Sequence, residues 1–338
     1  MKQTLISAAV ALSMSLAGVT GIAAPAKKQV AATTKAKISG KQGSKVSVKP
    51  AKTSTVAAKK KEKALPVARK AAPDVSIASH DDHRHLVLQS SAALVQDQAT
   101  GAVLFEKNAS AVLPIASITK LMTAMVTLDA KPNLQELMVI SDEDVDVLKG
   151  TRSRLKVGTQ LTREEMLRLA LMSSENRAAS ALSRYYPGGR PAFVAAMNRK
   201  AAALGLTGTH FEDSTGLTSA NVSSAKDLVR MVAAAHQYPL IREFSTTADY
   251  EVNVAGRTEI FRNTNPLVRT QNDWEIGLSK TGYINEAGKC LVMQAWFNNK
   301  PTIIVLLDSW GKLTRIGDAN RIKRWIESAS VAHKTRAG

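Results

Sequence analysis

The order of two hydrophobic patterns along this chain restricts its fold more than any other feature. From about residue 115 to residue 240, apolar residues recur at helical spacing, and a capping box at Thr162–Glu165 marks one helix start. On either side of this region the pattern changes to short apolar runs bounded by turn residues, which predict strands. We therefore expect an α+β fold in which the terminal segments form a sheet and the middle forms a mostly helical insert.

The expected strands can be assigned individually. Turns at Gly101 and Gly256 each indicate a hairpin. The strands that we expect in the sheet are residues 93–97, 102–106, 277–284, 289–297 and 302–307. An amphipathic helix over 314–329 should pack on the sheet. The prediction is an antiparallel five-stranded sheet flanked by helices, with the functional site in a cleft between the sheet and the insert.

Ser117 and Lys120 lie near the start of the first expected helix. They are three residues apart, so their side chains lie on one helix face, one above the other. A serine hydroxyl becomes a good nucleophile when a base takes its proton, and a neutral lysine amine can be that base. Burial, or a second cation nearby, would lower the pKa of the amine. The helix N-terminus would add a positive field where an oxyanion forms.

Two further motifs follow this pair in a fixed order. Ser174–Asn176 lies at an expected junction of two helices, where side chains can project into a cleft. Lys280–Gly282 lies on an expected strand, and its glycine would let a substrate approach the strand edge closely. A serine and a lysine three residues apart would be weak evidence alone. The three ordered motifs together form the set found in serine penicillin-interacting enzymes.

With these motifs in place, the chain resembles the penicillin-recognising serine DD-peptidases and β-lactamases. The resemblance extends over about residues 92–329. The longer phrases that carry it are Pro114–Met125, Ala170–Ala179, Phe261–Asn265 and Lys280–Gly282. Within the family, these phrases resemble those of D-alanyl-D-alanine endopeptidases. The resemblance implies the fold described above and a serine D,D-endopeptidase that hydrolyses peptidoglycan cross-links and is inhibited by penicillin and related β-lactams.

The resemblance also implies how the reaction proceeds. Ser117 would attack the carbonyl carbon of D-alanine and form an acyl-enzyme, with Lys120 as the base. Ser174 would relay the proton to the leaving amine. The backbone N–H groups of Ser117 and Tyr283 would form the oxyanion hole. The chemistry requires no metal and no organic cofactor.

The remaining motif residues are implied to bind substrate. Asn176 would orient both the substrate and Lys120. Lys280 would supply positive charge for a substrate carboxylate and would keep Lys120 neutral. Thr281 would donate a hydrogen bond to that carboxylate, and Gly282 would leave space for the substrate.

A β-lactamase would share this fold and these motifs. Class A β-lactamases carry a deacylating glutamate in a Glu-x-x-Leu-Asn context, and no such sequence lies between Asn176 and Lys280. Without that base a penicilloyl-enzyme should persist, so we expect inhibition rather than rapid hydrolysis. Glu175 receives no catalytic role, because in this family the side chain at its position points away from the nucleophile. We expect a solvated acid at a helix start.

Three other functions remain open from the sequence. A carboxypeptidase would cleave after D-alanine as well, but would release a terminal D-alanine instead of a cross-linked diamino acid. A Ser-His-Asp hydrolase could use His210, Asp213 and Ser214, but no Gly-x-Ser-x-Gly sequence surrounds a serine, and residues 214–217 are better explained as a loop beside the cleft. A wall-binding protein with a decayed catalytic domain is disfavoured, because every motif residue is intact.

The first 24 residues have the features of a secretory signal peptide. Lys2 precedes the apolar run Leu5–Val19, and small residues at Ala23 and Ala24 offer a cleavage site. The run is short for a membrane span, and an uncleaved anchor is the alternative. We therefore expect export to the periplasm and a soluble protein after cleavage.

A basic low-complexity tail, residues 25–85, follows the signal peptide. Residues 27–70 hold 14 lysines and arginines and one acid, and thus most of the chain's net charge of +18. We expect a solvated linker before a catalytic domain at 86–330, with a short tail at 331–338. For the basic tail, residues 25–85, the functional interpretation is electrostatic contact with anionic wall polymers or a membrane surface. Nucleic acid is not expected, because residues 25–75 contain no aromatic side chain for base stacking.

Two features raise the question of a metal site. His80–His85 has the composition of a metal cluster, but no scaffold flanks it, and a polar linker is the preferred interpretation. Cys290 is the single cysteine, which excludes an intramolecular disulfide and a cysteine metal cluster. Its strand-like surroundings predict a small buried residue. We therefore expect neither a metal nor a cofactor.

Overall fold

The structure is a computed structural model that describes residues 86–254, 256–270 and 273–337, with side chains up to residue 329. The expected signal peptide and basic tail lie outside these residues. Within the described part of the chain, no helix is both long and apolar enough to cross a membrane.

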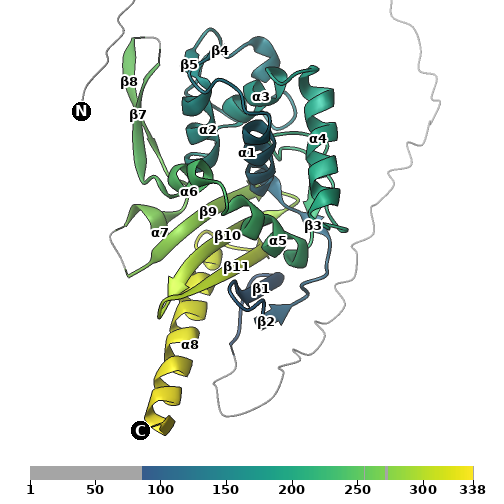
Figure 1. Cartoon of the computed structure of the whole chain (residues 1–338). Helices are drawn as coiled ribbons and strands as arrows, with labels where there is room; N and C mark the ends of the chain where they lie inside the picture. The colour runs from purple at the N-terminus through teal and green to yellow at the C-terminus, as the bar shows by residue number, and fades with distance from the viewer. Residues whose placement is uncertain (1–85, 255, 271–272, 338) are drawn as a thin grey trace, which may run out of the picture. The chain divides into compact units, whose positions relative to one another are not determined.

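A five-stranded antiparallel sheet lies at the centre of the described unit (Figure 1). Its strands, in spatial order, are β2 (Val103–Lys107), β1 (Ala92–Asp97), β11 (Lys300–Ser309), β10 (Gly288–Phe297) and β9 (Glu275–Ile284). β1 pairs with β11, so the two N-terminal strands, β1 and β2, and the three C-terminal strands, β9 to β11, form one sheet. The α+β class and the antiparallel five-stranded sheet predicted from the sequence are confirmed.

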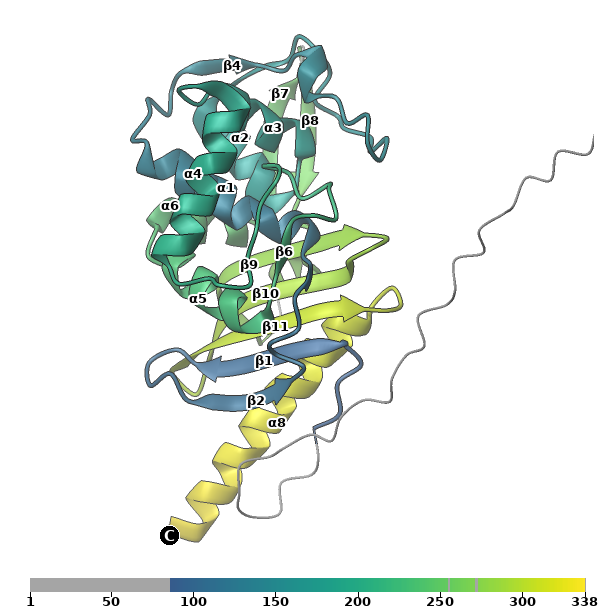
Figure 2. The ribbon, with the colours of Figure 1, turned by 90° about the vertical axis from the view of Figure 1, so that its right-hand side faces the viewer.

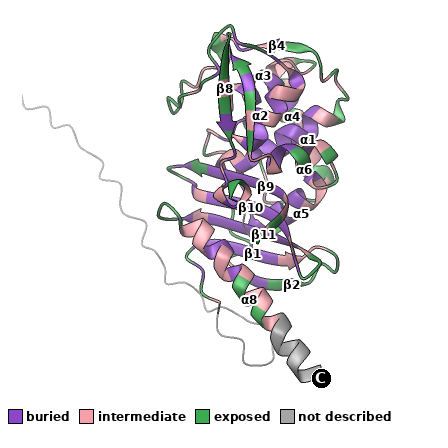
Figure 3. Cartoon of the chain, turned by 90° about the vertical axis from the view of Figure 1, so that its left-hand side faces the viewer, coloured by how far each residue is buried: buried purple, intermediate pink, exposed green. Residues whose placement is uncertain are grey.

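Both faces of the sheet are covered, which explains why its central strands are almost entirely apolar. Alternate residues of β11 point to opposite faces. Ile303 and Val305 pack into the core of the helical insert, whereas Ile304 and Leu306 pack into a second core beneath the C-terminal helix. Figure 3 shows that the inner strands β1, β11 and β10 consist mostly of buried residues. The sheet is therefore enclosed between two layers of helix.

The helical insert lies between β2 and β9 in the sequence and covers one face of the sheet (Figure 2). Its main helices are η1 (Ala116–Thr119), α1 (Lys120–Asp129), α2 (Arg163–Met172), α3 (Asn176–Arg184), α4 (Gly189–Ala203), α5 (Ala225–Ala235) and α6 (Pro239–Thr246). The capping box expected at the start of α2 is present, since Thr162 and Glu165 each accept a backbone hydrogen bond from the other. α1 is buried along nearly its whole length and forms the centre of the insert.

Several short elements were not predicted from the sequence. They are α6, β3 (Leu113–Pro114) with β6 (Val222–Ser223), β4 (Leu137–Val139) with β5 (Gln160–Thr162), η2 (Asp142–Asp144) and α7 (Pro266–Arg269). Strands of two or three residues carry too little periodicity to be recognised. The hairpin expected around Gly256 is present as β7 (Asp249–Val254) and β8 (Arg257–Arg262), which leads through α7 into β9.

The C-terminal helix, α8, packs on the face of the sheet opposite the insert. Ala319 and Ile322, two residues of its predicted apolar face, are fully buried there. The helix spans Thr314–Ala337, which corrects the predicted helix end at residue 329. Neither proline nor glycine occurs between residues 318 and 337, so the sequence contains no strong stop before Gly338.

Candidate active site

Ser117 is carried by a tight backbone turn rather than by a regular α-helix. It lies in the 3-10 helix η1, directly before α1, and follows Ala116, whose φ of 48° is in the left-handed region. Such a φ costs about 1–2 kcal/mol in a residue with a side chain, and persists only where the surrounding structure holds it. Ile115 and Ala116 are completely buried, so packing holds this turn. Ser117 itself lines a cleft.

The amino group of Lys120 lies at the centre of the site. Its Nζ is 2.8 Å from the Ser117 Oγ, 2.8 Å from the Asn176 Oδ1 and 2.6 Å from the backbone carbonyl oxygen of Thr215. The Asn176 amide is oriented by a further hydrogen bond, which its Nδ2 donates to the Thr151 Oγ1 at 3.1 Å. The serine and the lysine that the sequence placed on one face are therefore in direct contact.

Two buried lysines share this site, and burial lowers the pKa of both. The pKa of Lys120 falls from 10.5 to about 7, although the carboxylates of Asp213 and Glu175 act in the opposite direction. The pKa of Lys280 lies well below its usual range because of burial and of the nearby charges of Lys120 and Arg315. Two ammonium groups in one water-poor site repel each other, so each charge favours the neutral form of the other amine. An amine that can accept a proton is therefore present.

The partners of Lys120 determine where its lone pair points. A neutral amine has two N–H groups and one lone pair. The Asn176 Oδ1 and the Thr215 carbonyl oxygen can only accept hydrogen bonds, so they take the two N–H groups. The third partner, the Ser117 hydroxyl, can donate. The lone pair therefore faces Ser117, and the arrangement can remove the proton of that hydroxyl.

Ser174 lies at the junction between α2 and α3, where the sequence predicted it. Like Ala116, Ser174 is a non-glycine residue whose backbone adopts the left-handed conformation, with a φ of 62°. Its Oγ accepts a hydrogen bond from the Lys280 Nζ at 2.9 Å, and it lines the same cleft as Ser117. The structure thus brings together side chains from all three motifs, which lie far apart in the sequence.

Glu175 is not the solvated acid that the sequence predicted. Its side chain is half-buried, and its Oε2 accepts a hydrogen bond from the Ser153 Oγ at 2.6 Å. Burial raises the pKa of Glu175. The prediction that the Glu175 side chain is solvated was wrong, because the segment around Ser153, 22 residues earlier in the sequence, covers the start of α3. Glu175 is absent from the lining of the cleft that contains Ser117.

The third motif lies on the edge strand β9, but its glycine makes a different contact from the one expected. A Cβ at Gly282 would lie 2.8 Å from the carbonyl oxygen of Ile115 and 3.1 Å from the backbone nitrogen of Ser117. The missing side chain therefore lets β9 approach the turn that carries Ser117. Gly282 also lines the cleft, and its predicted role in letting a substrate approach the strand stays a prediction.

Thr281 and Tyr283 lie on either side of Gly282 and both line the cleft. The Thr281 Oγ1 donates a hydrogen bond to the Thr264 Oγ1 at 2.6 Å, which joins β9 to the segment between β8 and α7. Tyr283 is 54% exposed, and its hydroxyl donates to the Asn285 Oδ1 at 2.9 Å. The role of its backbone N–H in an oxyanion hole stays a prediction.

The cleft that contains these groups has a volume of about 550 Å³ and lies between the sheet and the insert. Its lining residues are Ser117, Ser174, Asn176, Arg262, Asn263, Thr264, Arg269, Thr281, Gly282, Tyr283 and Arg315. None of them carries a carboxylate, whereas three are arginines. The cleft is therefore suited to an anionic ligand.

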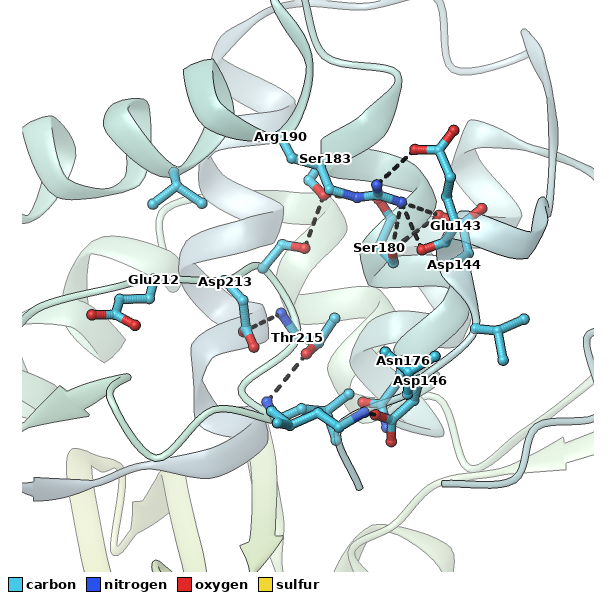
Figure 4. Close-up of a pocket in the computed structure, with 16 residues that line it drawn as sticks. Glu143, Asp144, Asp146, Asn176, Ser180, Ser183, Arg190, Glu212, Asp213 and Thr215 are labelled. Atoms are coloured by element: carbon cyan, nitrogen blue, oxygen red, sulfur yellow. Dashed lines mark hydrogen bonds and ion pairs between the residues drawn. The ribbon is translucent and has the colours of Figure 1, made fainter. Parts of the chain in front are cut away.

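The sequence gave no indication that the Thr215 carbonyl would contact Lys120. The loop that presents it is held by Asp213, whose Oδ1 accepts from the backbone N–H groups of Thr215 at 2.8 Å and Gly216 at 2.5 Å. Figure 4 shows the bond between Asp213 and Thr215. The run Asp-Ser-Thr-Gly is typical of a turn. A turn sequence does not reveal which carbonyl oxygen will face a lysine.

Arg315 is a second residue that the sequence did not single out. It belongs to the first turn of α8, and its Nη1 donates to the carbonyl oxygens of Gly282 at 2.8 Å and Cys290 at 3.1 Å. Burial lowers the pKa of Arg315, but a guanidinium remains protonated at neutral pH. α8 therefore contributes a permanent positive charge to the cleft from the far side of the sheet.

The Ser-His-Asp alternative has no support in the structure. The buried Ser214 Oγ lies 3.0 Å from both the Ala179 carbonyl oxygen and the Ser183 Oγ, so its hydroxyl is engaged within the insert. His210 has a side chain that is 58% exposed, and its Nε2 lies 3.9 Å from a carboxylate oxygen of Glu212. The segment that contains Ser214 forms a loop beside the cleft, as the sequence predicted.

A second pocket, of about 220 Å³, shares Asn176 and Thr215 with the site (Figure 4). Several acids line it, but they are engaged within the protein. Arg190 lies 2.8 Å from a carboxylate oxygen of Glu143 and 3.0 Å from one of Asp144. We therefore assign no ligand to this pocket.

No group of three or more His, Cys, Asp or Glu side chains within the described residues is placed to hold a metal ion. His80–His85 lies outside those residues. Cys290 is buried, as predicted, and burial raises the pKa of its thiol to about 11. The expectation of neither a metal nor a cofactor stays a prediction.

Comparisons with known proteins agree with this geometry. The family model of peptidase S11, described as D-alanyl-D-alanine carboxypeptidase, matches residues 78–311. The chain is 51% identical over 248 residues to a D-alanyl-D-alanine endopeptidase of Pseudomonas aeruginosa and 46% identical over 246 residues to one of Escherichia coli, and each match covers 72% of this chain and 79% of the relative. The Streptomyces K15 DD-transpeptidase structure matches with a TM-score of 0.65 at 28% identity, over 71% of this chain and 97% of that one. The chain therefore belongs to the D-alanyl-D-alanine carboxypeptidase family of serine DD-peptidases, peptidase family S11.

Proposed function

We propose that the chain is a serine D,D-endopeptidase that hydrolyses the cross-links between D-alanine and a diamino acid in peptidoglycan. The observation that carries the proposal is the direct contact of the buried Lys120 amine with the Ser117 hydroxyl, because this contact can activate the serine. The choice of a cross-link as substrate is supported by two relatives named D-alanyl-D-alanine endopeptidases, at 51% and 46% identity.

In the acylation step, the Ser117 Oγ attacks the carbonyl carbon of D-alanine while the Lys120 Nζ takes the hydroxyl proton. The negative charge that develops on the carbonyl oxygen is stabilised by the backbone N–H groups of Ser117 and Tyr283. The C–N bond then breaks, and the proton moves from Lys120 by way of Ser174 to the leaving nitrogen. The products of this step are an ester on Ser117 and a free amine.

In the deacylation step, water occupies the position that the amine has left. Its proton passes to Lys120, its oxygen attacks the ester carbonyl, and the C–O bond to Ser117 breaks as the proton returns to the serine. The catalytic groups thus end in their starting states. No group outside the protein is needed for the proton balance.

Binding of the substrate is assigned to the residues on and around β9. Thr281 and Lys280 hold the carboxylate next to the bond that is cleaved, and Arg315 adds a permanent charge on the same side of the cleft. A bound carboxylate would raise the pKa of Lys280 and keep it charged, which favours the neutral form of Lys120. Asn176 holds the amine of Lys120 in its orientation.

A D-alanyl-D-alanine carboxypeptidase is the second candidate, favoured by the description of the matching family model. Both activities use the same acyl-enzyme and differ in the leaving group. A carboxypeptidase releases a single D-alanine, whereas an endopeptidase releases a second peptide chain.

A muropeptide profile separates the two activities. The protein without its first 24 residues is incubated with cross-linked peptidoglycan, and Ser117→Ala serves as the control. We expect cross-linked dimers to fall to monomers only with intact Ser117. Shortening of pentapeptides to tetrapeptides, with the dimers untouched, would establish the carboxypeptidase instead. A profile identical to that of the Ser117→Ala control would reject both and favour a wall-binding protein.

We expect penicillin to inhibit this enzyme by forming a long-lived ester on Ser117. The leaving nitrogen of a β-lactam stays attached to the acyl group, so it blocks the position that water must occupy. The lining of the cleft provides no carboxylate to activate water from another direction. Intact-protein mass spectrometry should show one penicilloyl group per chain, and released penicilloate should remain well below one equivalent over an hour. Hundreds of turnovers per enzyme in that hour would place the chain with the β-lactamases.

We also infer export to the periplasm and a role for the basic tail, residues 25–85, in contact with anionic wall polymers. Both inferences rest on the sequence, through the apolar run Leu5–Val19 and the 14 basic residues of segment 27–70. Deletion of residues 25–75 should reduce sedimentation with purified cell walls at low salt. Unchanged sedimentation would show that the tail is only a linker.

A further inference from the structure

The cleft carries more positive charge than the reaction at Ser117 requires. Three arginines line it, Arg262, Arg269 and Arg315, and no acid does. Arg315 is engaged with two backbone carbonyl oxygens beneath β9. Arg262 and Arg269 are exposed. Their guanidinium groups make no hydrogen bond or ion pair in the described structure, although many other arginines of the insert are paired with acids.

Arg262 and Arg269 stand on a rigid support. They are the last residues of β8 and α7, and the segment between them is anchored by two buried asparagines. The Asn263 Nδ2 donates to the carbonyl oxygens of residues 245 and 247, each at 2.9 Å. The Asn265 Nδ2 donates to the Ser279 Oγ on β9 at 2.9 Å. Exposed arginines on a fixed backbone are suited to binding a ligand rather than to holding the fold together.

This support is attached to the part of the site that faces the leaving group. Thr264, between the two arginines in sequence, accepts a hydrogen bond from the Thr281 Oγ1 at 2.6 Å. Thr281 is the residue to which we assign the carboxylate next to the cleaved bond. A leaving group that extends from that carboxylate past Thr264 would therefore meet the wall that carries Arg262 and Arg269.

We propose that Arg262 and Arg269 bind a carboxylate of the second peptide, the one released when a cross-link is cut. The proposal rests on the proposed endopeptidase function. A released D-alanine has one carboxylate, which Thr281 takes. A cross-linked leaving group is part of a longer peptide, which has its own terminal carboxylate beyond the bond. Guanidinium groups pair with carboxylates in a fixed, often bidentate geometry, so the pair selects cross-linked leaving groups over single D-alanine.

Two synthetic cross-linked peptides test the proposal, one with a free terminal carboxylate on the released chain and one with a carboxamide there. Each is given to the wild-type enzyme, to Arg262→Gln, to Arg269→Gln and to the double variant. Arg199→Gln, which changes an exposed arginine of α4 outside the cleft, is the matched control. A short peptide ending in D-Ala-D-Ala reports on the reaction centre alone.

We expect the wild-type enzyme and Arg199→Gln to cleave the free acid with a KM about three- to tenfold lower than the KM for the amide. The double variant should lose this preference, with kcat within about twofold of the wild type, because exposed charge pairs contribute to ground-state binding. The preference should also shrink at 0.5 M salt.

The outcomes separate this proposal from the function on which it rests. If the wild-type enzyme cleaves both cross-linked peptides and the double variant keeps the same preference for the free acid, the arginine site is rejected and the endopeptidase stands. If the wild-type enzyme cleaves neither peptide but still shortens the D-Ala-D-Ala peptide, the endopeptidase function fails and the arginine site fails with it.

Discussion

Replacement of Lys120 by arginine is expected to lower the rate at which penicillin or a peptide acylates Ser117 by about 10³-fold or more. Arginine keeps hydrogen-bond donors that can reach Asn176 and Thr215, but it does not give up a proton at neutral pH. The variant therefore removes the base and puts a permanent charge where the wild-type enzyme needs a neutral amine. Stopped-flow measurement of penicilloyl-enzyme formation provides the rate, and a thermal melt reports on the fold.

The same experiment has a pH dependence whose sign follows from the buried amine. The pKa of Lys120 is about 7, and only its neutral form can accept the serine proton. The neutral fraction rises with pH, so acylation should increase about tenfold per pH unit below 7 and level off above pH 8. Lys120→Arg should show no inflection in this range.

Two results would contradict the assignment of Lys120 as the base. One is a Lys120→Arg enzyme that retains more than a tenth of the wild-type rate with an unchanged melting temperature. The other is a wild-type acylation rate that is flat between pH 5 and pH 8. Ser117→Ala provides the baseline, because it removes the nucleophile and should form no covalent adduct at all.

The sequence predicts those residues of the site that lie close together in the chain or belong to a motif of known spacing. Ser117 and Lys120 share a face because they are three residues apart, and their contact at 2.8 Å follows from that spacing. The Thr215 carbonyl could not be predicted, because every residue has a carbonyl and only the tertiary fold aims one at Lys120. The burial of Glu175 was missed for the same reason.

The strands that are buried on both faces could be predicted from the sequence. β10 and β11 are covered on both faces, so their sequences are continuous apolar runs. Gly282 illustrates the limit of this approach. The sequence indicates that a backbone approaches closely, but not whether a substrate or the turn at Ser117 is the neighbour. That choice depends on the packing of β9 against η1, two elements more than 150 residues apart in the chain.

The loop that contains Gly216 also packs against the turn that carries Ser117, and the second large effect is expected for Gly216→Ala. Gly216 has a φ of 80°, and a Cβ there would lie 2.0 Å from the carbonyl oxygen of Ala116 and 2.9 Å from the backbone nitrogen of Ser117. The backbone of one of the two loops must therefore move. We expect a loss of about 3 kcal/mol or more in the free energy of unfolding, which lowers Tm by roughly 6–12 °C for a domain of this size.

The displacement should affect activity as well as stability, because the turn that moves carries the nucleophile. A shift of about 1 Å at a reacting atom costs on the order of 100-fold in rate. Gly101→Ala is the matched control, since its φ of 74° imposes the same backbone strain but no atom lies within 4 Å of the added methyl group. Gly101→Ala should cost about 1–2 kcal/mol and leave acylation unchanged. Equal losses of Tm and of acylation rate in the two variants would show that backbone strain alone acts at Gly216, and that its contact with the Ser117 turn has no part in positioning the serine.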